Sequence, residues 1–313
     1  MPRPEVARAV CASVSRIEGS VMSQLLAIRN HLAAPGPRAR PKYAVLYTSG
    51  WFVLWLEGTD TVVDEALQRA AADSRNEHQK LLHRSHGPAT LRERVLVAST
   101  QTPLKPTQFA RWILHMQAEG QSVEPVEIWN RLGAPCLLEI SSQPQPRPVQ
   151  HFAFIADDDH GPVDQLRKLG ERFASPVIYQ RFGVARSNSP DMGMAYVDVP
   201  VQAGAARVRV LSGRAMGRAA VRHSMPPHDA VVLLIGNRPE ATIQLATHLA
   251  DALRPFDKRP KVWLGGATGE PVAACVRLLA QVGVVAEDAP LSGNERSNLP
   301  ALLHVAGLSP AVQ

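Results

Sequence analysis

A proline-rich segment, QPQPRP at 143–148, divides this chain of 313 residues and limits how it can fold. Proline fixes φ and lacks an amide N–H, so such a run favours a stiff, extended spacer. The order of strand-like and helix-like segments also changes across it. We therefore expect two domains, at 1–100 and 151–313, joined by a helical and proline-rich connector at 101–150.

The N-terminal part has the order β-α-β-β-α-β-β. Ser20 is placed to cap the first helix, and Asp60 or Thr61 to cap the second. Ser49-Gly50 is a turn between two apolar strands. The expected strands are 6–14, 43–49, 51–57, 79–84 and 94–99, and the expected helices are 20–33 and 60–73. This order predicts an α+β ferredoxin-like fold, in which two helices lie on one face of an antiparallel sheet.

The C-terminal part begins with a strand and a helix, continues with a hairpin and then alternates strands and helices. The expected strands are 151–156, 194–201, 206–212, 229–236 and 261–266, and the expected helices are 162–173, 239–254, 269–283 and 292–303. Such alternation predicts an α/β domain with an open, mostly parallel sheet and helices on both faces. The connector holds one more amphipathic helix, at 106–119, with Pro106 in its first turn.

Charge and cysteine content exclude several classes of protein. The net charge of +6 is spread thinly and forms no basic stripe, so we expect no nucleic-acid partner. Cys11, Cys136 and Cys275 lie far apart and have no zinc-site spacing, so we expect reduced thiols and no bound metal. No apolar run is long enough to cross a membrane, and no signal peptide follows Met1. These features favour a cytoplasmic protein of bacterial type.

Three segments of the N-terminal part resemble a BLUF domain, the flavin-binding sensor of blue light. They are SVSRIEG at 13–19, VLYTSGWFVLWLEG at 45–58 and ADSRN at 72–76. The resemblance covers about residues 6–100. It implies a ferredoxin-like fold in which a tyrosine and a glutamine form the light-switched hydrogen-bond network and an asparagine holds the isoalloxazine ring of the flavin.

None of these three residue types stands at the matching positions. The resemblance places Ser13 at the tyrosine, Leu54 at the glutamine and Gly36, or a neighbour of it, at the asparagine, while Asn30 lies on the helix itself. A buried flavin edge would then lack partners, at a cost of ~1–3 kcal/mol for each unsatisfied group. We therefore expect a BLUF-like fold that has lost its flavin.

The segment FIADDDHGPVDQLRKLGERF at 154–173 resembles the first strand, phosphate loop and first helix of a Ras-like small GTPase. The loop signature GxxxxGK[ST] matches Ala156, Gly161, Pro162 and Val163. The lysine and the magnesium-binding hydroxyl are thus replaced, and 157–159 carry three aspartates. We expect a pseudo-GTPase that has lost its nucleotide site.

Two other families share short features with the C-terminal part. Asp157-Asp158, with Asp198 later in the chain, is similar to the acidic site of a response-regulator receiver. The Asp158-x-His160 pattern, with KVWLGGATGEP further on, is similar to a cobalamin-binding domain. Neither pattern is complete, and both families stay open as alternatives at this point.

One strand exposes a candidate interaction surface. Trp51, Val53 and Trp55 alternate with Leu54 and must point away from the face that would hold flavin. Either the helix at 106–119 covers them, or a second copy or another protein does.

We therefore expect a non-catalytic signalling or scaffold protein that has no cofactor and acts through protein partners, such as a homodimer or a signalling GTPase system. The alternatives are a blue-light photoreceptor with an unusual flavin site and a GTPase-like nucleotide switch.

Overall fold

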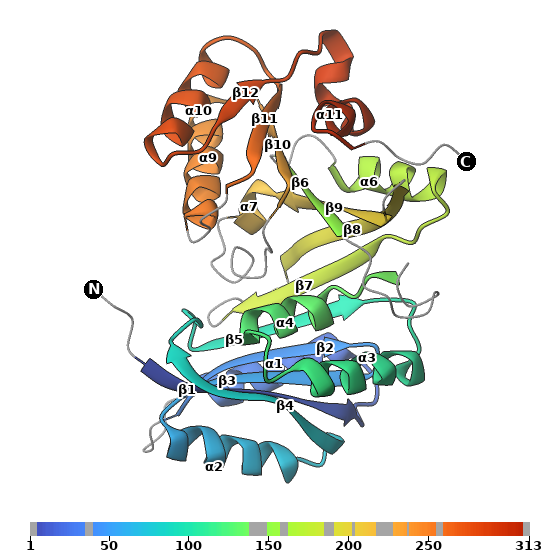
Figure 1. Ribbon diagram of the computed structural model, residues 1–313, viewed down its shortest axis with the longest axis vertical. Coiled ribbons are helices and arrows are strands. Elements are labelled where there is room, and N and C mark those ends of the chain that lie inside the picture. Colours follow the sequence, from blue (N-terminus) through green and yellow to red (C-terminus); the bar gives the residue numbers. More distant parts are fainter. Residues whose placement is uncertain are drawn as a thin grey trace. The chain divides into compact units, whose positions relative to one another are not determined.

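The computed structural model describes residues 5–34, 40–137, 149–156, 162–184, 191–201, 204–216, 228–236, 238–254 and 259–308. The chain forms two compact units. Unit 1 comprises Met1–Pro135 and Gln180–Met192, and unit 2 comprises Cys136–Tyr179 and Gly193–Gln313 (Figure 1). The helical part of the connector expected at 101–150 clusters with unit 1, and its proline-rich part at 143–148 lies outside the described residues.

Unit 1 contains the expected β-α-β-β-α-β-β series. Its elements are β1 (Glu5–Ser15), α1 (Val21–Ala33), β2 (Lys42–Thr48), β3 (Trp51–Gly58), α2 (Asp60–Ala71), β4 (Asn76–Pro88), β5 (Val95–Gln101), α3 (Pro106–Glu119) and α4 (Pro125–Gly133). The sheet order is β5-β2-β3-β1-β4, and β7 (Ile178–Val184) follows at the β5 edge. Strand β3 is antiparallel to β1 and β2, whereas β2 and β5 are parallel.

The predicted turn between β2 and β3 is confirmed. Ser49 and Gly50 have φ values of 48° and 78°. Positive φ at both central residues matches the twist of a tight hairpin, and glycine adopts it at little cost. A Cβ on Gly50 would also lie 2.7 Å from Pro106 Cγ, so the start of α3 approaches this turn closely.

Helices α1 and α2 cover one face of the sheet, as predicted. Leu25 of α1 and Val63 and Ala66 of α2 pack on Ala9, Val45, Leu56 and Val97 of the strands. Ser20 caps α1 by accepting a hydrogen bond from the amide of Ser23. The N-cap of α2 is Thr59, and not Asp60 or Thr61, because Thr59 is the last residue with extended backbone.

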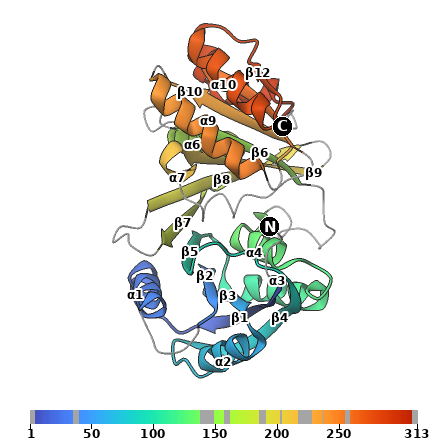
Figure 2. The ribbon, with the colours of Figure 1, turned by 90° about the vertical axis from the view of Figure 1, so that its left-hand side faces the viewer.

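Helices α3 and α4 lie on the opposite face of the same sheet (Figure 2). The bounds predicted for α3 are confirmed, and its buried residues are Phe109, Ile113 and Met116. The sequence analysis missed α4, a short helix that begins at Pro125 and buries Ile128, Trp129 and Leu132. Unit 1 is therefore a three-layer structure with helices on both sides of its sheet.

Unit 2 has the predicted open, mostly parallel sheet. Its elements are β6 (Val149–Ala156), α6 (Pro162–Arg172), β8 (Asp191–Val201), β9 (Gly204–Ser212), α7 (Gly213–Met216), β10 (Ala230–Ile235), α9 (Pro239–Leu253), β11 (Lys261–Gly266), α10 (Glu270–Gln281), β12 (Ala286–Asp288), η2 (Gly293–Ser297) and α11 (Leu299–Val305). The strand order is β8-β9-β6-β10-β11-β12. Strands β8 and β9 form the predicted antiparallel hairpin, and the other neighbours are parallel.

Helices cover both faces of this sheet. Leu166 and Leu169 of α6 and Leu302 of α11 pack on Phe154 and Val208, while α9 and α10 lie against the other face (Figure 1). The single helix predicted at 292–303 is wrong. Asn298 has extended backbone, and its side chain caps α11 at the amide of Ala301, so a separate 3₁₀ turn precedes α11.

Candidate functional site

The sheet face beneath α1 and α2 carries two of the three positions that the BLUF resemblance assigns to flavin. Ser13 lies opposite Phe52, and Leu54 lies opposite Cys11, in the β1–β3 ladder. Because directly opposed residues share a face, Ser13 and Leu54 point to the same side. Ser13 is buried, and Leu54 packs against the core under the helices.

The surroundings of Ser13 and Leu54 are mostly apolar. Tyr47 and Phe52 meet edge to face with their ring centroids 5.7 Å apart, and burial raises the pKa of Tyr47. Burial also raises the pKa of the Cys11 thiol to about 12, so it stays protonated. These groups do not fit the polar edge of a flavin, because Leu54 offers no hydrogen bond where a side-chain amide would be needed. Gly36 lies outside the described residues.

Helix α1 also carries a buried arginine that the sequence analysis missed. Arg29 is 2% exposed. Its Nε and Nη2 atoms donate to Asn30 Oδ1 at 3.2 and 2.9 Å. The amide oxygen of Asn30 is therefore engaged on an exposed part of the helix, and Asn30 does not replace the asparagine of a flavin site. The periodicity of α1 gave no sign of this, since apolar spacing identifies only the apolar members of a buried face.

On the opposite face, the candidate interaction surface is buried within unit 1. Trp51, Val53 and Trp55 are at most 4% exposed. Trp51 Nε1 donates to the Pro106 carbonyl at 3.0 Å, and the ring of Trp55 lies 6.2 Å from that of Trp129. Of the two alternatives, the structure agrees with cover from within the chain: α3, the predicted helix, and α4 together bury these side chains.

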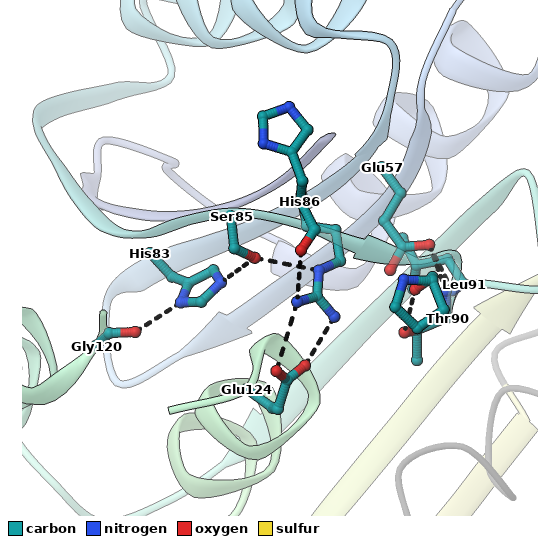
Figure 3. Close-up of polar contacts among 10 residues, drawn as sticks. Glu57, His83, Ser85, His86, Thr90, Leu91, Gly120 and Glu124 are labelled. Atoms are coloured by element: carbon teal, nitrogen blue, oxygen red, sulfur yellow. Dashed lines mark hydrogen bonds and ion pairs between the residues drawn. The ribbon is translucent and has the colours of Figure 1, made fainter. Parts of the chain in front are cut away.

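A polar network, drawn in Figure 3, fastens the α3–α4 connection to this face. Arg8 of β1 donates to Glu124 at 2.7 Å and, through Nε, to Ser85 Oγ at 3.1 Å. His83 contacts Ser85 Oγ through Nε2 and the Gly120 carbonyl through Nδ1, both at 2.6 Å. Since a carbonyl only accepts, Nδ1 carries the proton and Ser85 donates to Nε2. The network thus links the sheet to the residue after α3, Gly120, and to the residue before α4, Glu124.

Glu57 extends the network along β3. It lies opposite Arg8 in the β1–β3 ladder and is 2% exposed. Its Oε2 atom accepts from the amides of Thr90 and Leu91 at 2.8 and 2.7 Å (Figure 3). Burial raises the pKa of Glu57 even though these two amides favour the charged form. The carboxyl group therefore fixes the segment after β4 and has no free reach toward a substrate.

In unit 2, the position of the predicted phosphate loop follows β6. Ala156 ends this strand and is fully buried. Gly161 and residues 157–160 lie outside the described residues. Pro162 begins α6, and Val163 is half-buried in its first turn. Neither residue has the ammonium or hydroxyl group that a phosphate loop needs at these places.

Asp198 does not form the acidic site of a receiver. It is 2% exposed and accepts from Arg207 Nε at 2.7 Å and from Arg207 Nη2 at 2.9 Å. The Leu137 amide also donates to it, at 3.2 Å. This carboxylate is therefore saturated, and the receiver alternative is wrong for this residue. The His160 of the cobalamin-type pattern lies outside the described residues.

Among the described residues, no group of three or more His, Cys, Asp or Glu side chains is arranged to hold a metal ion. The three histidines of β4 differ in their surroundings: His78 is exposed, His83 is buried, and His86 contacts Asp60 at 3.0 Å. His83 is therefore not a surface histidine. None of the helices in the described ranges is long and apolar enough to span a membrane.

No protein-family model matches the chain, and no curated protein sequence matches it. Part of the chain is similar to solved BLUF structures. A BLUF protein, BlrB in its dark state, is 19% identical over 32% of this chain and 74% of its own, with a TM-score of 0.26. A bacterial light-regulated adenylyl cyclase is 14% identical over 41% of this chain and 39% of its own, with a TM-score of 0.27. The BLUF domain of BlrP1 is 16% identical over 39% of this chain and 82% of its own, with a TM-score of 0.26.

Proposed function

We propose that this chain is a non-catalytic signalling protein that acts by binding other proteins. In this proposal unit 1 is a BLUF-like domain without flavin, and unit 2 is a GTPase-like domain without nucleotide. Both units keep a fold used for switching while the groups that would hold the ligand are replaced. Binding of partners then depends on protein surfaces and not on light or on a nucleotide.

The observation that carries the proposal is the place of Leu54. It points to the same sheet face as Ser13 and packs against the core beneath α1 and α2. A flavin bound there would leave its polar edge against apolar carbon, and an unsatisfied buried polar group costs ~1–3 kcal/mol. The apolar surroundings of Leu54 therefore support the proposal that unit 1 does not bind flavin as the BLUF family does.

Unit 2 supports the proposal in a similar way. Its antiparallel hairpin, β8–β9, lies beside β6, the strand that precedes the predicted phosphate loop. The resemblance to a Ras-like GTPase implies this hairpin. Pro162 and Val163 stand where that resemblance requires a lysine and a hydroxyl.

Capture of partners under two light conditions tests the function. The full chain is immobilised and exposed to an extract of its native host in the dark and under blue light. We expect the same specific partner in both conditions, above a column carrying an unrelated protein. A partner that is retained in one light condition only would favour the photoreceptor alternative, and the absence of any specific partner would contradict the proposal.

Thermal melting with nucleotides tests the role of unit 2. A ligand that binds only the folded state at 100 times its Kd stabilises a protein by about 2.7 kcal/mol. Melting with millimolar GTP–Mg²⁺ or ATP–Mg²⁺ should therefore leave the transition of the full chain unchanged. A saturable rise of several degrees would support the nucleotide-switch alternative instead.

A further inference from the structure

Two buried arginines, two positions apart, lie on the same face of strand β9 in unit 2. Arg207 and Arg209 alternate with Val208 and Val210, which belong to the core beneath α6 and α11, so both arginines point to the opposite face. They are 3% and 2% exposed. Arginine is almost never fully buried unless it is paired, so we expect each of the two side chains to have an acceptor or an anion as its partner.

Arg207 has its partner. Its Nε and Nη2 atoms donate to the two oxygens of Asp198, and its guanidinium lies 4.2 Å from the ring centroid of Tyr196. Asp198 and Tyr196 stand opposite Arg207 and Arg209, respectively, in the β8–β9 ladder. The bidentate pair uses one cation and one carboxylate, so the negative charge of Asp198 is already matched by Arg207.

In the described part of unit 2, Arg209 has no such carboxylate partner. Its Nη1 atom lies 2.9 Å from His151 Nδ1, and its buried Nε atom makes no hydrogen bond. Burial, together with the nearby charges of Arg209 and Arg207, lowers the pKa of His151 to about 2, so the ring is neutral and Nδ1 accepts. Burial and the charge of Arg207 lower the pKa of Arg209 to about 9, so this guanidinium is still a cation at neutral pH.

Among the residues that the structure describes, no carboxylate is hydrogen-bonded to Arg209, so its buried guanidinium has no matching anion there. An unpaired buried charge is strongly unfavourable, and one anion would compensate it. The geometry also selects the kind of anion. Because Nη1 of Arg209 is bound to His151, the edge of the guanidinium that includes Nε is available for a ligand. Such an edge can donate two parallel hydrogen bonds, which suits a ligand group with two adjacent oxygens.

We propose that Arg209 anchors an anion-binding site in unit 2, whose ligand is a small molecule or ion carrying a phosphate or carboxylate group. His151 orients the guanidinium by accepting from Nη1, and Arg207 adds positive potential while it stays bound to Asp198. The site uses none of the residues that the GTPase resemblance assigns to the phosphate loop. It does not depend on the proposed function.

Thermal melting of the full chain with two anions tests this site. Sodium phosphate or sodium acetate replaces sodium chloride at constant ionic strength and pH 7, and the melting temperature is followed as a function of anion concentration. We expect a saturable rise with at least one of the two anions, and the stronger response identifies the ligand group. A wild-type chain that shows no saturable response to either anion would overturn the proposal.

Three variants separate this site from general effects of salt. In Arg209→Met the saturable rise should disappear, and in Arg209→Lys, which keeps the charge but lacks the two-nitrogen edge, the affinity should fall by about tenfold or more. Arg254→Met removes a charge from an exposed position beside Asp251 and should respond like the wild type.

Phosphate stabilises many proteins by exclusion from their surface, so an equal response of the wild type and Arg209→Met would contradict the site. If Arg209→Met does not fold, Arg209→Lys decides: wild-type affinity in that variant overturns the proposal.

Discussion

The two faces of the unit 1 sheet are buried by different means. Beneath α1 and α2, strands and helices meet mainly through apolar side chains such as Leu25, Val45 and Leu56. Beneath α3 and α4, two tryptophans are combined with directional bonds from Arg8 and His83 to the helix connection. Apolar contact fixes how close two layers lie, whereas hydrogen bonds with a required geometry also fix which segment lies where.

This difference bears on function. The face that the BLUF resemblance assigns to a cofactor is the apolar one, and the face with the polar groups is closed by protein. The charged and polar groups of the second face are used in holding α3 and α4, so they are not arranged around a ligand. Four changes to unit 1 would test the comparison, and they follow in order of expected effect.

Trp55→Ala should cause the largest loss of stability, ~3–5 kcal/mol, because it leaves a cavity between β3 and α4. Urea denaturation measures the free energy of unfolding. Trp112→Ala is the control, because Trp112 of α3 is only partly buried. This variant should lose clearly less unfolding free energy than Trp55→Ala. Light scattering should give the same mass for Trp55→Ala as for the wild type. A stable Trp55→Ala variant with a lower mass would mean that this face is an interface.

Leu54→Gln tests the apolar face. A glutamine amide there would be partly buried without a partner, and we expect a loss of about 1–2 kcal/mol in the free energy of unfolding. Leu114→Gln, at a site that is 54% exposed, should change it by less than about 0.5 kcal/mol. Equal losses for the two variants would show that Leu54 is not part of the packed face.

Glu124→Gln tests the polar network on the other face. Glu124 is 64% exposed on its side chain, so the pair with buried Arg8 is partly screened, and we expect a loss of about 1 kcal/mol. Glu127→Gln removes an exposed pair with Arg131 on the same helix and should cost less than about 0.5 kcal/mol. If Glu124→Gln costs no more than its control, the network does not hold the α3–α4 connection.

Glu57→Gln should have the smallest effect, which appears in the pH dependence. Burial raises the pKa of Glu57 in the folded state above its unfolded value. The folded protein therefore binds this proton more tightly, and the contribution of Glu57 to stability is lost as pH rises through the folded pKa. Between pH 4 and pH 7 the difference in unfolding free energy, wild type minus Glu57→Gln, should decrease. A difference that increases with pH would contradict the assignment.

Most of the order of strands and helices in the two units could be predicted from the sequence, because alternation, caps and turn residues are local signals, but the short elements α4, β7 and β12 were missed. The tight turn at Ser49-Gly50 is one example. The sequence could not say what α3 covers, since its apolar face is compatible with any apolar partner. Residues far apart in sequence were missed for a related reason: Arg8 and Glu124 are 116 positions apart and share no local pattern.

The arginines of β9 show a second limit. Alternation of Arg207 and Arg209 with valines is the pattern of a strand with one face in water. Unit 2 instead covers both faces of its sheet, so these arginines are buried. Burial makes the partners of these arginines important for stability, and within the described ranges Arg209 has no carboxylate partner. Only the tertiary structure reveals this, because the pattern of a strand does not say how many layers surround it.

The flavin content of the purified full chain tests whether unit 1 has lost its flavin. The protein is expressed in cells that make flavin, incubated with excess FAD, freed of unbound FAD and then denatured, and the absorbance is recorded before and after denaturation. We expect a colourless protein that releases no flavin. A yellow protein that releases one FAD per chain on denaturation would show that unit 1 binds flavin and overturn the proposed function.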